Sequence, residues 1–313
     1  MNLCTVHVPG AFTTVQDLGR FGYQQMGIPV SGALDAAACR VANLLVGNSE
    51  TAAVLELTIT GPKLAFMAET AVALTGAEMG MFINGSPAAS WHAHRLKPGD
   101  MLEIRQVTRG CRGYLAVSGG IQVPPVMGSR ATYVGGALGG FNGRPLKAGD
   151  VLPGSPAPAL PPPRGIPKEW IPEHGKDILL RVVPGPQDDF FDAGMKTLLS
   201  SAFMVTPKAD RMGYRLQGPE IRRRADAPAS IVSEPSMPGG IQIPADNQPI
   251  ILLVEQTVGG YAKIATVIST DLPRLAQATP GDTVTFEQIT LEAAHGRYRE
   301  QEDRLRKIAG LFI

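Results

Sequence analysis

Apolar and polar residues alternate along this chain mostly in short runs, a pattern typical of β-strands. Two runs, 250–254 and 264–268, are rich in β-branched residues and predict two strands. A further strand signal is a Gly-Asp turn that leads directly into a run of β-formers, and it occurs at 97–104, 147–152 and 279–286. The pattern therefore predicts a mainly β fold.

Helical periodicity is confined to a few segments, so the predicted fold has few helices. The first begins after Asp35, a suitable N-cap, and places apolar residues on one stripe before a Gly-Asn stop. The last is a charged helix that we expect at the surface. The four predicted helices cover 34–48, 186–203, 271–278 and 289–310.

Composition narrows the possible functions. The 313 residues carry a formal net charge of +1 and only 18% charged residues, so no basic field indicates nucleic acid or an anionic membrane as partner. No run approaches the roughly 20 apolar residues of a membrane helix, and the N-terminus lacks a signal-peptide pattern. Three cysteines at unpatterned spacings suit reduced thiols. We therefore expect a cytoplasmic protein.

A proline-rich stretch divides the chain nearly in half. Residues 152–167 contain seven prolines, which are incompatible with a sheet interior and typical of an extended spacer. The predicted organisation is an N-terminal β domain at 1–151, the spacer, and a C-terminal β domain with a terminal helix at 168–313.

The two halves also share short sequence elements. The pattern R-x-G-Y-x-x-x-G occurs at 20–27 and at 211–218, and GGIQ occurs at 119–122 and at 239–242. The offsets differ, so the chain is no regular repeat. Together these elements favour two related β-rich domains.

Several catalytic signatures are missing from the sequence. It contains neither a phosphate-binding loop nor a dinucleotide fingerprint. His92 and His94 are two residues apart, so on a strand both side chains would lie on one face. No second Cys or His pair follows at the spacing of metal ligands, so we expect no metal site. Met195-Lys196 resembles a biotin acceptor but lies in a helix-like segment, so we expect no biotin attachment in this chain.

Polar residues and glycines gather in three stretches, 13–35, 210–219 and 233–267. Glycines beside Arg, Gln and Tyr let the backbone approach a ligand closely and supply paired donors and acceptors, as a site for a small polar amide requires. Two alternatives stay open. The residues could decorate ordinary loops, and the two R-x-G-Y arginines could pair with the nearby aspartates, Asp17 and Asp210.

The same stretches closely resemble a known family. TTVQDLGRFGYQQMGIPVSGALD (13–35), RMGYRLQG (211–218) and QPIILLVEQTVGGYAKIATV (248–267) are similar to the C subunit of 5-oxoprolinase, a family also described as biotin-dependent carboxyltransferase-like or allophanate hydrolase subunit 2-like. The similarity runs from about residue 8 to about residue 290. It implies two cyclophilin-like β-barrel domains.

The resemblance also implies an enzyme that is active only in a complex. Such a chain binds a smaller B subunit tightly, and joins an A subunit for turnover, to convert 5-oxo-L-proline to L-glutamate with hydrolysis of ATP to ADP and phosphate. The amide is a poor electrophile, and its phosphorylation explains the need for ATP. Two alternatives remain: the carboxyltransferase component of a biotin-dependent urea or amide carboxylase, and a non-catalytic partner that regulates a sensor kinase.

Site residues follow from the matching motifs. The arginines of the two R-x-G-Y elements are expected to bind a carboxylate or a phosphate in bidentate fashion. The residues expected to take part in catalysis are Gln256, Tyr261 and Lys263. Those expected to bind substrate are Asp17, Arg20, Arg211, Tyr214, Gln242, Gln248, Thr257, Gly259 and Gly260.

Overall fold

The computed structural model describes residues 1–156 and 160–312. The chain folds into two compact units. The first consists of Met1–Arg20, Ser31–His174 and the C-terminal end from Arg304. The second consists of Phe21–Val30 and Gly175–Asp303. A short segment of the N-terminal region thus belongs to the second unit, and the end of the chain belongs to the first.

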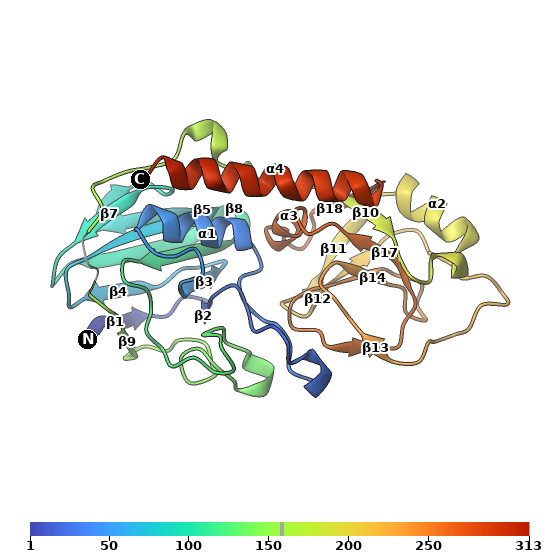
Figure 1. Cartoon of the computed structure of the whole chain (residues 1–313), viewed down its shortest axis with the longest axis horizontal. Coiled ribbons are helices and arrows are strands. Elements are labelled where there is room, and N and C mark those ends of the chain that lie inside the picture. Colours follow the sequence, from blue (N-terminus) through green and yellow to red (C-terminus); the bar gives the residue numbers. More distant parts are fainter. Residues whose placement is uncertain (157–159, 313) are drawn as a thin grey trace. The chain divides into compact units, whose positions relative to one another are not determined.

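The first unit is built on one large sheet (Figure 1). Its main strand order is β2-β3-β8-β4-β1-β9, and β5 pairs with β6, β7 and β8. The 17-residue β8 pairs with β3, β4 and β5, and bulges along its pairing with β5 let the sheet curl. The strands are β1 Asn2–Val8, β2 Phe12–Gln16, β3 Val54–Thr58, β4 Lys63–Phe66, β5 Thr70–Ile83, β6 Ser86–Ala88, β7 Ala93–Leu96, β8 Met101–Val117 and β9 Val151–Pro153.

Helix α1 (Ala36–Leu45) covers part of this sheet and confirms the helix predicted at 34–48. The Asp35 carboxylate accepts a hydrogen bond from the Ala38 N–H at 2.9 Å, the N-cap that the sequence predicts. Its apolar stripe, with Val41 and Leu45, is buried in a cluster that also contains Tyr114 of β8. The residues that the helical period places on one face are therefore the residues that are buried in this cluster.

All three Gly-Asp turns occur, and they share one hydrogen bond. Asp100, Asp150 and Asp282 each accept from the N–H three residues earlier, at 2.7 Å in every case. The glycine before each aspartate has a positive φ of 93°, 87° or 96°, a conformation that glycine adopts without steric cost. The turns lead into β8, β9 and β18, as predicted.

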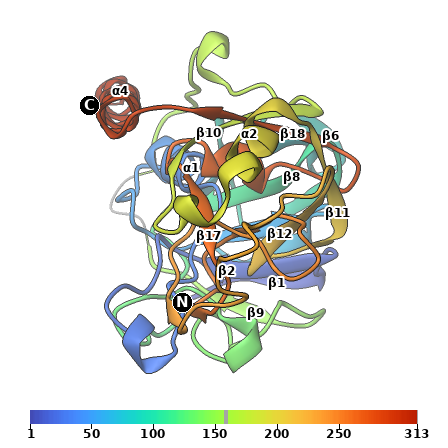
Figure 2. The same ribbon diagram turned by 90° about the vertical axis from the view of Figure 1, so that its right-hand side faces the viewer.

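The second unit is a closed barrel of seven strands in the order β10-β17-β14-β15-β12-β11-β18 (Figure 2). Only β10 and β18 pair in parallel among these neighbours. Phe203 and Phe286 meet edge to face in its core, with ring centroids 5.9 Å apart. The strands are β10 Asp177–Pro184, β11 Phe203–Ala209, β12 Gly213–Gln217, β14 Gly240–Gln242, β15 Ile250–Leu252, β17 Lys263–Val267 and β18 Thr283–Gln288.

Short elements complete this unit. A two-stranded ribbon, β13 (Glu234–Pro235) with β16 (Val258–Gly259), lies outside the barrel hydrogen-bonding path. The remaining α-helices among the described residues are α2 Asp192–Ser200, α3 Leu272–Ala276 and α4 Leu291–Gly310, and the end of α4 belongs to the first unit. The described 3-10 helices are η1 Gln24–Met26 and η4 Asp188–Phe190 in this unit, and η2 Val134–Gly136 and η3 Lys168–Trp170 in the first unit. The predicted fold class, mainly β with a few helices and two barrel domains, is confirmed.

The predicted boundaries at 1–151, 152–167 and 168–313 stay a prediction. Contacts divide the chain after His174, and the described part of the proline-rich stretch belongs to the first unit. There, Arg95 donates to the carbonyls of Leu160 and Pro161, both at 3.0 Å. Residues 157–159 of the predicted spacer lie outside the described residues.

Candidate functional site

Six residues of the second unit form a compact group that we call the polar cluster: Gln187, Glu234, Ser236, Gln242, Gly259 and Lys263. Strand register brings them together. Lys263, the first residue of β17, pairs with Gln242 of β14, and Glu234 of β13 pairs with Gly259 of β16. Residues far apart in the sequence therefore share one site.

A buried ammonium and a carboxylate form the charged part of the polar cluster. The Lys263 side chain is only 7% exposed, and its Nζ donates to Glu234 Oε1 at 2.5 Å. Gln187 holds both partners, because its Oε1 accepts from the Lys263 N–H at 2.9 Å and its Nε2 donates to Glu234 Oε1 at 3.1 Å. These bonds, Lys263 first, hold the pKa of Glu234 below its usual range. The Glu234 carboxyl group is therefore ionised at neutral pH.

Two polar groups of the polar cluster have no hydrogen-bond partner among the described residues. They are Gln242 Nε2 and Ser236 Oγ, in residues that are 3% and 2% exposed. A buried amide or hydroxyl without a partner costs about 1–3 kcal/mol, so such groups are rare in folded proteins. The hydrogen-bonding capacity of both groups is thus unused among the described residues.

Gly259 is the glycine that this arrangement requires. A Cβ at Gly259 would lie 2.3 Å from Gln242 Nε2 and 3.3 Å from Ser236 Oγ. At Gly260 the nearest atoms are Ile231 O at 3.3 Å and Ser233 Oγ at 3.4 Å, which is much less restrictive. Of these two glycines, only Gly259 packs directly against the polar cluster.

The other predicted residues of this loop make no side-chain hydrogen bond to the polar cluster among the described residues. The Gln256 side chain donates to the carbonyl of Val258 at 2.8 Å, and Tyr261 is 44% exposed. Thr257 contributes through its backbone, because its carbonyl accepts from the Ser236 N–H at 2.8 Å. In the part of the chain that the structure describes, neither Gln256 nor Tyr261 bonds to a side chain of the polar cluster.

Gln248 and Tyr214 hold the barrel together. The Gln248 amide accepts from the Gly218 N–H at 2.8 Å and donates to the Gly218 carbonyl at 3.2 Å. The buried Tyr214 hydroxyl donates to the Ala278 carbonyl at 3.3 Å. Both side chains thus bind backbone groups of the second unit.

Arg211 forms a buried ion pair with Glu255, with 2.5 Å between Nε and Oε1. The Glu255 N–H also donates to the Arg211 carbonyl at 3.1 Å, so the pair joins the loop after β15 to the start of the R-x-G-Y element. The neighbouring Asp210 accepts from the N–H groups of Met212 and Gly213. The carboxylate of Glu255 was not singled out from the sequence.

Arg20 and Asp17 belong to the first unit and brace one loop there. The fully buried Arg20 donates to the carbonyls of Val126 and Ala131 at 3.0 and 2.8 Å. Asp17 accepts from Ser129 Oγ at 2.7 Å and from the Arg130 N–H at 2.6 Å. The two R-x-G-Y arginines therefore have different surroundings, carbonyls for Arg20 and a carboxylate for Arg211.

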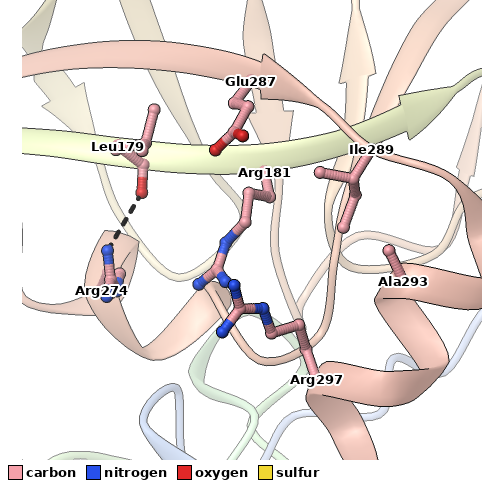
Figure 3. A pocket seen from close by; sticks show the side chains of 7 residues that line it. All are labelled: Leu179, Arg181, Arg274, Glu287, Ile289, Ala293 and Arg297. Carbon is pink, nitrogen blue, oxygen red and sulfur yellow. Dashed lines mark hydrogen bonds between the residues drawn. The ribbon is translucent and has the colours of Figure 1, made fainter.

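A separate pocket of about 360 Å³ opens on the second unit. Figure 3 shows its lining, which includes three arginines and no residue predicted from the sequence. The lining residues are Leu179, Arg181, Arg274, Glu287, Ile289, Ala293 and Arg297.

Metal-ligand clusters and membrane-spanning helices are both absent from the described residues. Within 1–156 and 160–312, no three His, Cys, Asp or Glu side chains are grouped so as to hold a metal ion. Across the same residues, no helix is long and apolar enough to cross a membrane.

The chain matches the sequence model of a protein family over residues 26–288. That family is the carboxyltransferase domain, subdomains A and B, and the chain belongs to it. It is 39% identical over 309 residues to the C subunit of 5-oxoprolinase from Escherichia coli strain K12, covering 96% of each chain. It is 33% identical to the C subunit of 5-oxoprolinase from Haemophilus influenzae, over 94% of this chain and 95% of that one. The resemblance predicted from the sequence is confirmed.

Longer proteins contain a similar region. The chain is 35% identical to urea amidolyase of Lachancea kluyveri over 94% of its own length, but spans only 17% of that protein. The crystal structure of Kluyveromyces lactis urea carboxylase superposes with a TM-score of 0.92 at 34% identity, over 98% of this chain and 29% of that one.

Proposed function

We propose that this chain is the C subunit of an ATP-dependent 5-oxoprolinase, which opens 5-oxo-L-proline to L-glutamate. The observation that carries the proposal is the 39% identity to the C subunit of a 5-oxoprolinase over 96% of both chains. The urea amidolyase relative is less similar, at 35% identity. The higher identity favours 5-oxoproline over urea.

The polar cluster suits a small lactam acid. Gln242 Nε2 and Ser236 Oγ are donors for a carbonyl oxygen, and the Lys263 ammonium can attract a carboxylate or negative charge that develops on oxygen. Overall, 5-oxoproline, ATP and two waters give glutamate, ADP and phosphate. Donors held in place before the reaction stabilise the oxygen at which charge develops, which is their largest contribution to rate.

Partners and nucleotide are part of the same proposal. The sequence has no phosphate-binding loop, so ATP is expected to be consumed only in an assembly with the B and A subunits. We place that assembly in the cytoplasm, where the three cysteines remain thiols.

A second candidate is carboxyl transfer from carboxybiotin to urea or a similar amide. The carboxyltransferase family model and the urea amidolyase relatives favour it. The biotin nitrogen would lose the carboxyl group and the amide nitrogen would gain it. The same donors could orient an amide oxygen, so geometry alone does not separate the two reactions.

A substrate comparison tests the proposal. The chain is purified and combined with the A and B subunits, and ADP and glutamate are measured with 5-oxoproline or urea. We expect equal amounts of ADP and glutamate with 5-oxoproline only, and no ATP hydrolysis by this chain alone. A parallel assay supplies carboxybiotin to the same assembly, and urea-dependent loss of its carboxyl group, without glutamate formation in the first assay, would overturn the proposal in favour of carboxyl transfer.

A further inference from the structure

The arginine pocket, defined by the seven residues that line it in Figure 3, is separate from the polar cluster. Its walls come from β10, α3, β18 and the segment that follows, and the first turns of α4. The side chains of Arg181 and Arg297 enter the pocket from different elements, β10 and α4.

One arginine of the pocket is held rigidly. Arg181 Nε donates to Asp271 Oδ2 at 2.8 Å and its Nη2 to Oδ1 at 2.5 Å, and Asp271 is completely buried. A bidentate pair of this kind fixes the plane of the guanidinium. The wall of the pocket is thus formed before any ligand arrives.

The other two arginines keep most of their binding capacity. Among the described residues, the Arg274 side chain makes only one long hydrogen bond, 3.5 Å from its Nη1 to the Leu179 carbonyl. Arg297 reaches Glu300 at 3.5 Å, and the side chains of this pair are both more than half exposed. An exposed ion pair of this length contributes little to stability, so water or a ligand can replace it. Both guanidiniums therefore have donors to offer.

The pocket also provides apolar surface and a suitable size. Leu179, Ile289 and Ala293 form the apolar part of its lining. A volume of about 360 Å³ falls at the lower end of the range for small-molecule sites, roughly 300–1,000 Å³. Glu287 is the one carboxylate of the lining, against three guanidiniums.

We propose that the arginine pocket binds a small organic anion. Its carboxylate or phosphate group contacts Arg274 and Arg297, and its hydrocarbon part lies on Leu179, Ile289 and Ala293. Planar guanidinium groups match the oxygens of both anions, so this chemistry is shared by the two ligand types. The proposal does not depend on the reaction assigned to the polar cluster.

Calorimetric titration of the purified chain at low ionic strength tests the inference, with three probes: glutarate, glycerol 3-phosphate and the uncharged glutaramide. At least one anion should bind while glutaramide does not. Binding of glutarate alone identifies a carboxylate site, binding of glycerol 3-phosphate alone a phosphate site, and binding of both a general anion site. Failure of both anions to bind would overturn the proposal.

Matched variants locate the binding. Arg274→Gln and Arg297→Gln should each weaken anion affinity by about ten-fold or more, the loss expected for a charge-assisted hydrogen bond. Arg299→Gln is the control, because Arg299 lies on the same helix and outside the pocket lining. Unfolding temperatures should match across all three variants. An equal loss in Arg299→Gln, or none in the pocket variants, would place the anion elsewhere and contradict the proposal.

Discussion

Gly259 is the residue whose replacement tests the packing of the polar cluster most simply. A Cβ there would meet Gln242 Nε2 at 2.3 Å, so Gly259→Ala must displace the Gln242 amide. Overpacking costs about 1–3 kcal/mol, and the cost here lies at the low end because the displaced atom is the end of a side chain and not backbone. We expect Gly259→Ala to lower both the unfolding temperature and the turnover of the assembly.

Gly260→Ala is the matched control, because its nearest contacts at 3.3 and 3.4 Å need only small shifts. The free energy of unfolding of this variant should fall by less than about 1 kcal/mol, and the assembly should keep most of its turnover. Thermal unfolding and turnover of both variants provide the comparison. Equal behaviour of the two variants would show that the Gln242 amide tolerates the extra carbon.

Glu234 should make stability depend on pH. Its folded-state pKa lies below the unfolded value because Lys263, and then Gln187, bond to the carboxylate. A depressed carboxyl pKa stabilises the fold fully above the unfolded pKa of about 4.3, and this contribution is lost as pH falls through the folded value. The difference in unfolding temperature between wild type and Glu234→Gln should therefore be largest near neutral pH and shrink below about pH 4.

Glu220→Gln is the control for this experiment, since Glu220 pairs with Arg222 while their side chains are 50% and 78% exposed. It should alter the unfolding temperature little at any pH. A Glu234→Gln difference that stays constant from pH 7 to pH 3 would contradict the assigned ion pair.

Local hydrogen bonding explains which residues the sequence could place. The Gly-Asp turns were predictable because donor and acceptor are three residues apart. Gln242, Gly259 and Lys263 lie in one stretch, and we predicted them together. Glu234 and Ser236 lie in the same stretch but were not chosen, because only strand pairing shows that Glu234 faces Gly259. Gln187 was missed because it lies outside this stretch and is joined to Lys263 and Glu234 by hydrogen bonds.

Neighbours in the sequence can also have different surroundings. Gln256 and Tyr261 flank Gly259, yet one bonds within its own loop and the other is exposed. Their predicted catalytic roles stay a prediction. Periodicity alone could not separate them from Lys263, because the β16–β17 loop breaks the strand alternation.

The C-terminal part of the proline-rich stretch is hydrogen-bonded to the first unit, although its composition indicates an extended spacer. Arg164 donates to the carbonyls of Leu44 and Leu45 at 2.7 and 2.8 Å, at the end of α1. Gly165 forms a bridge with His92. Cleavage requires a segment that can leave the surface, so trypsin should cut slowly after Arg164.

Arg222 provides the comparison, because it is 78% exposed and lies in the loop between β12 and β13. Mass spectrometry of a limited digest should detect cleavage in that loop first. Equally early cleavage after Arg164 would show that the stretch is a loose spacer, as its composition indicates.

The whole molecule has a less linear organisation than the sequence predicts. The chain leaves the first unit after Arg20, returns to it at Ser31, and ends in it from Arg304 onward. The proline content indicated a boundary near the middle of the chain. It could not show that the chain passes between the two units at other positions, because each such passage depends on long-range contacts. The family could nevertheless be identified from the sequence, because the sequence motifs that resemble it occur in both units.

The central claim is that the polar cluster carries the chemistry of a 5-oxoprolinase assembly. Its most direct test is 5-oxoproline turnover, with the A and B subunits, of the variants Lys263→Met and Gln242→Leu, each first checked for folding and for assembly with these partners. We predict a fall in kcat of about ten- to a thousand-fold for both, the range for losing one positioned donor. Gln256→Ala, whose amide bonds within its own loop, should lose less. Wild-type turnover in both cluster variants would contradict the account.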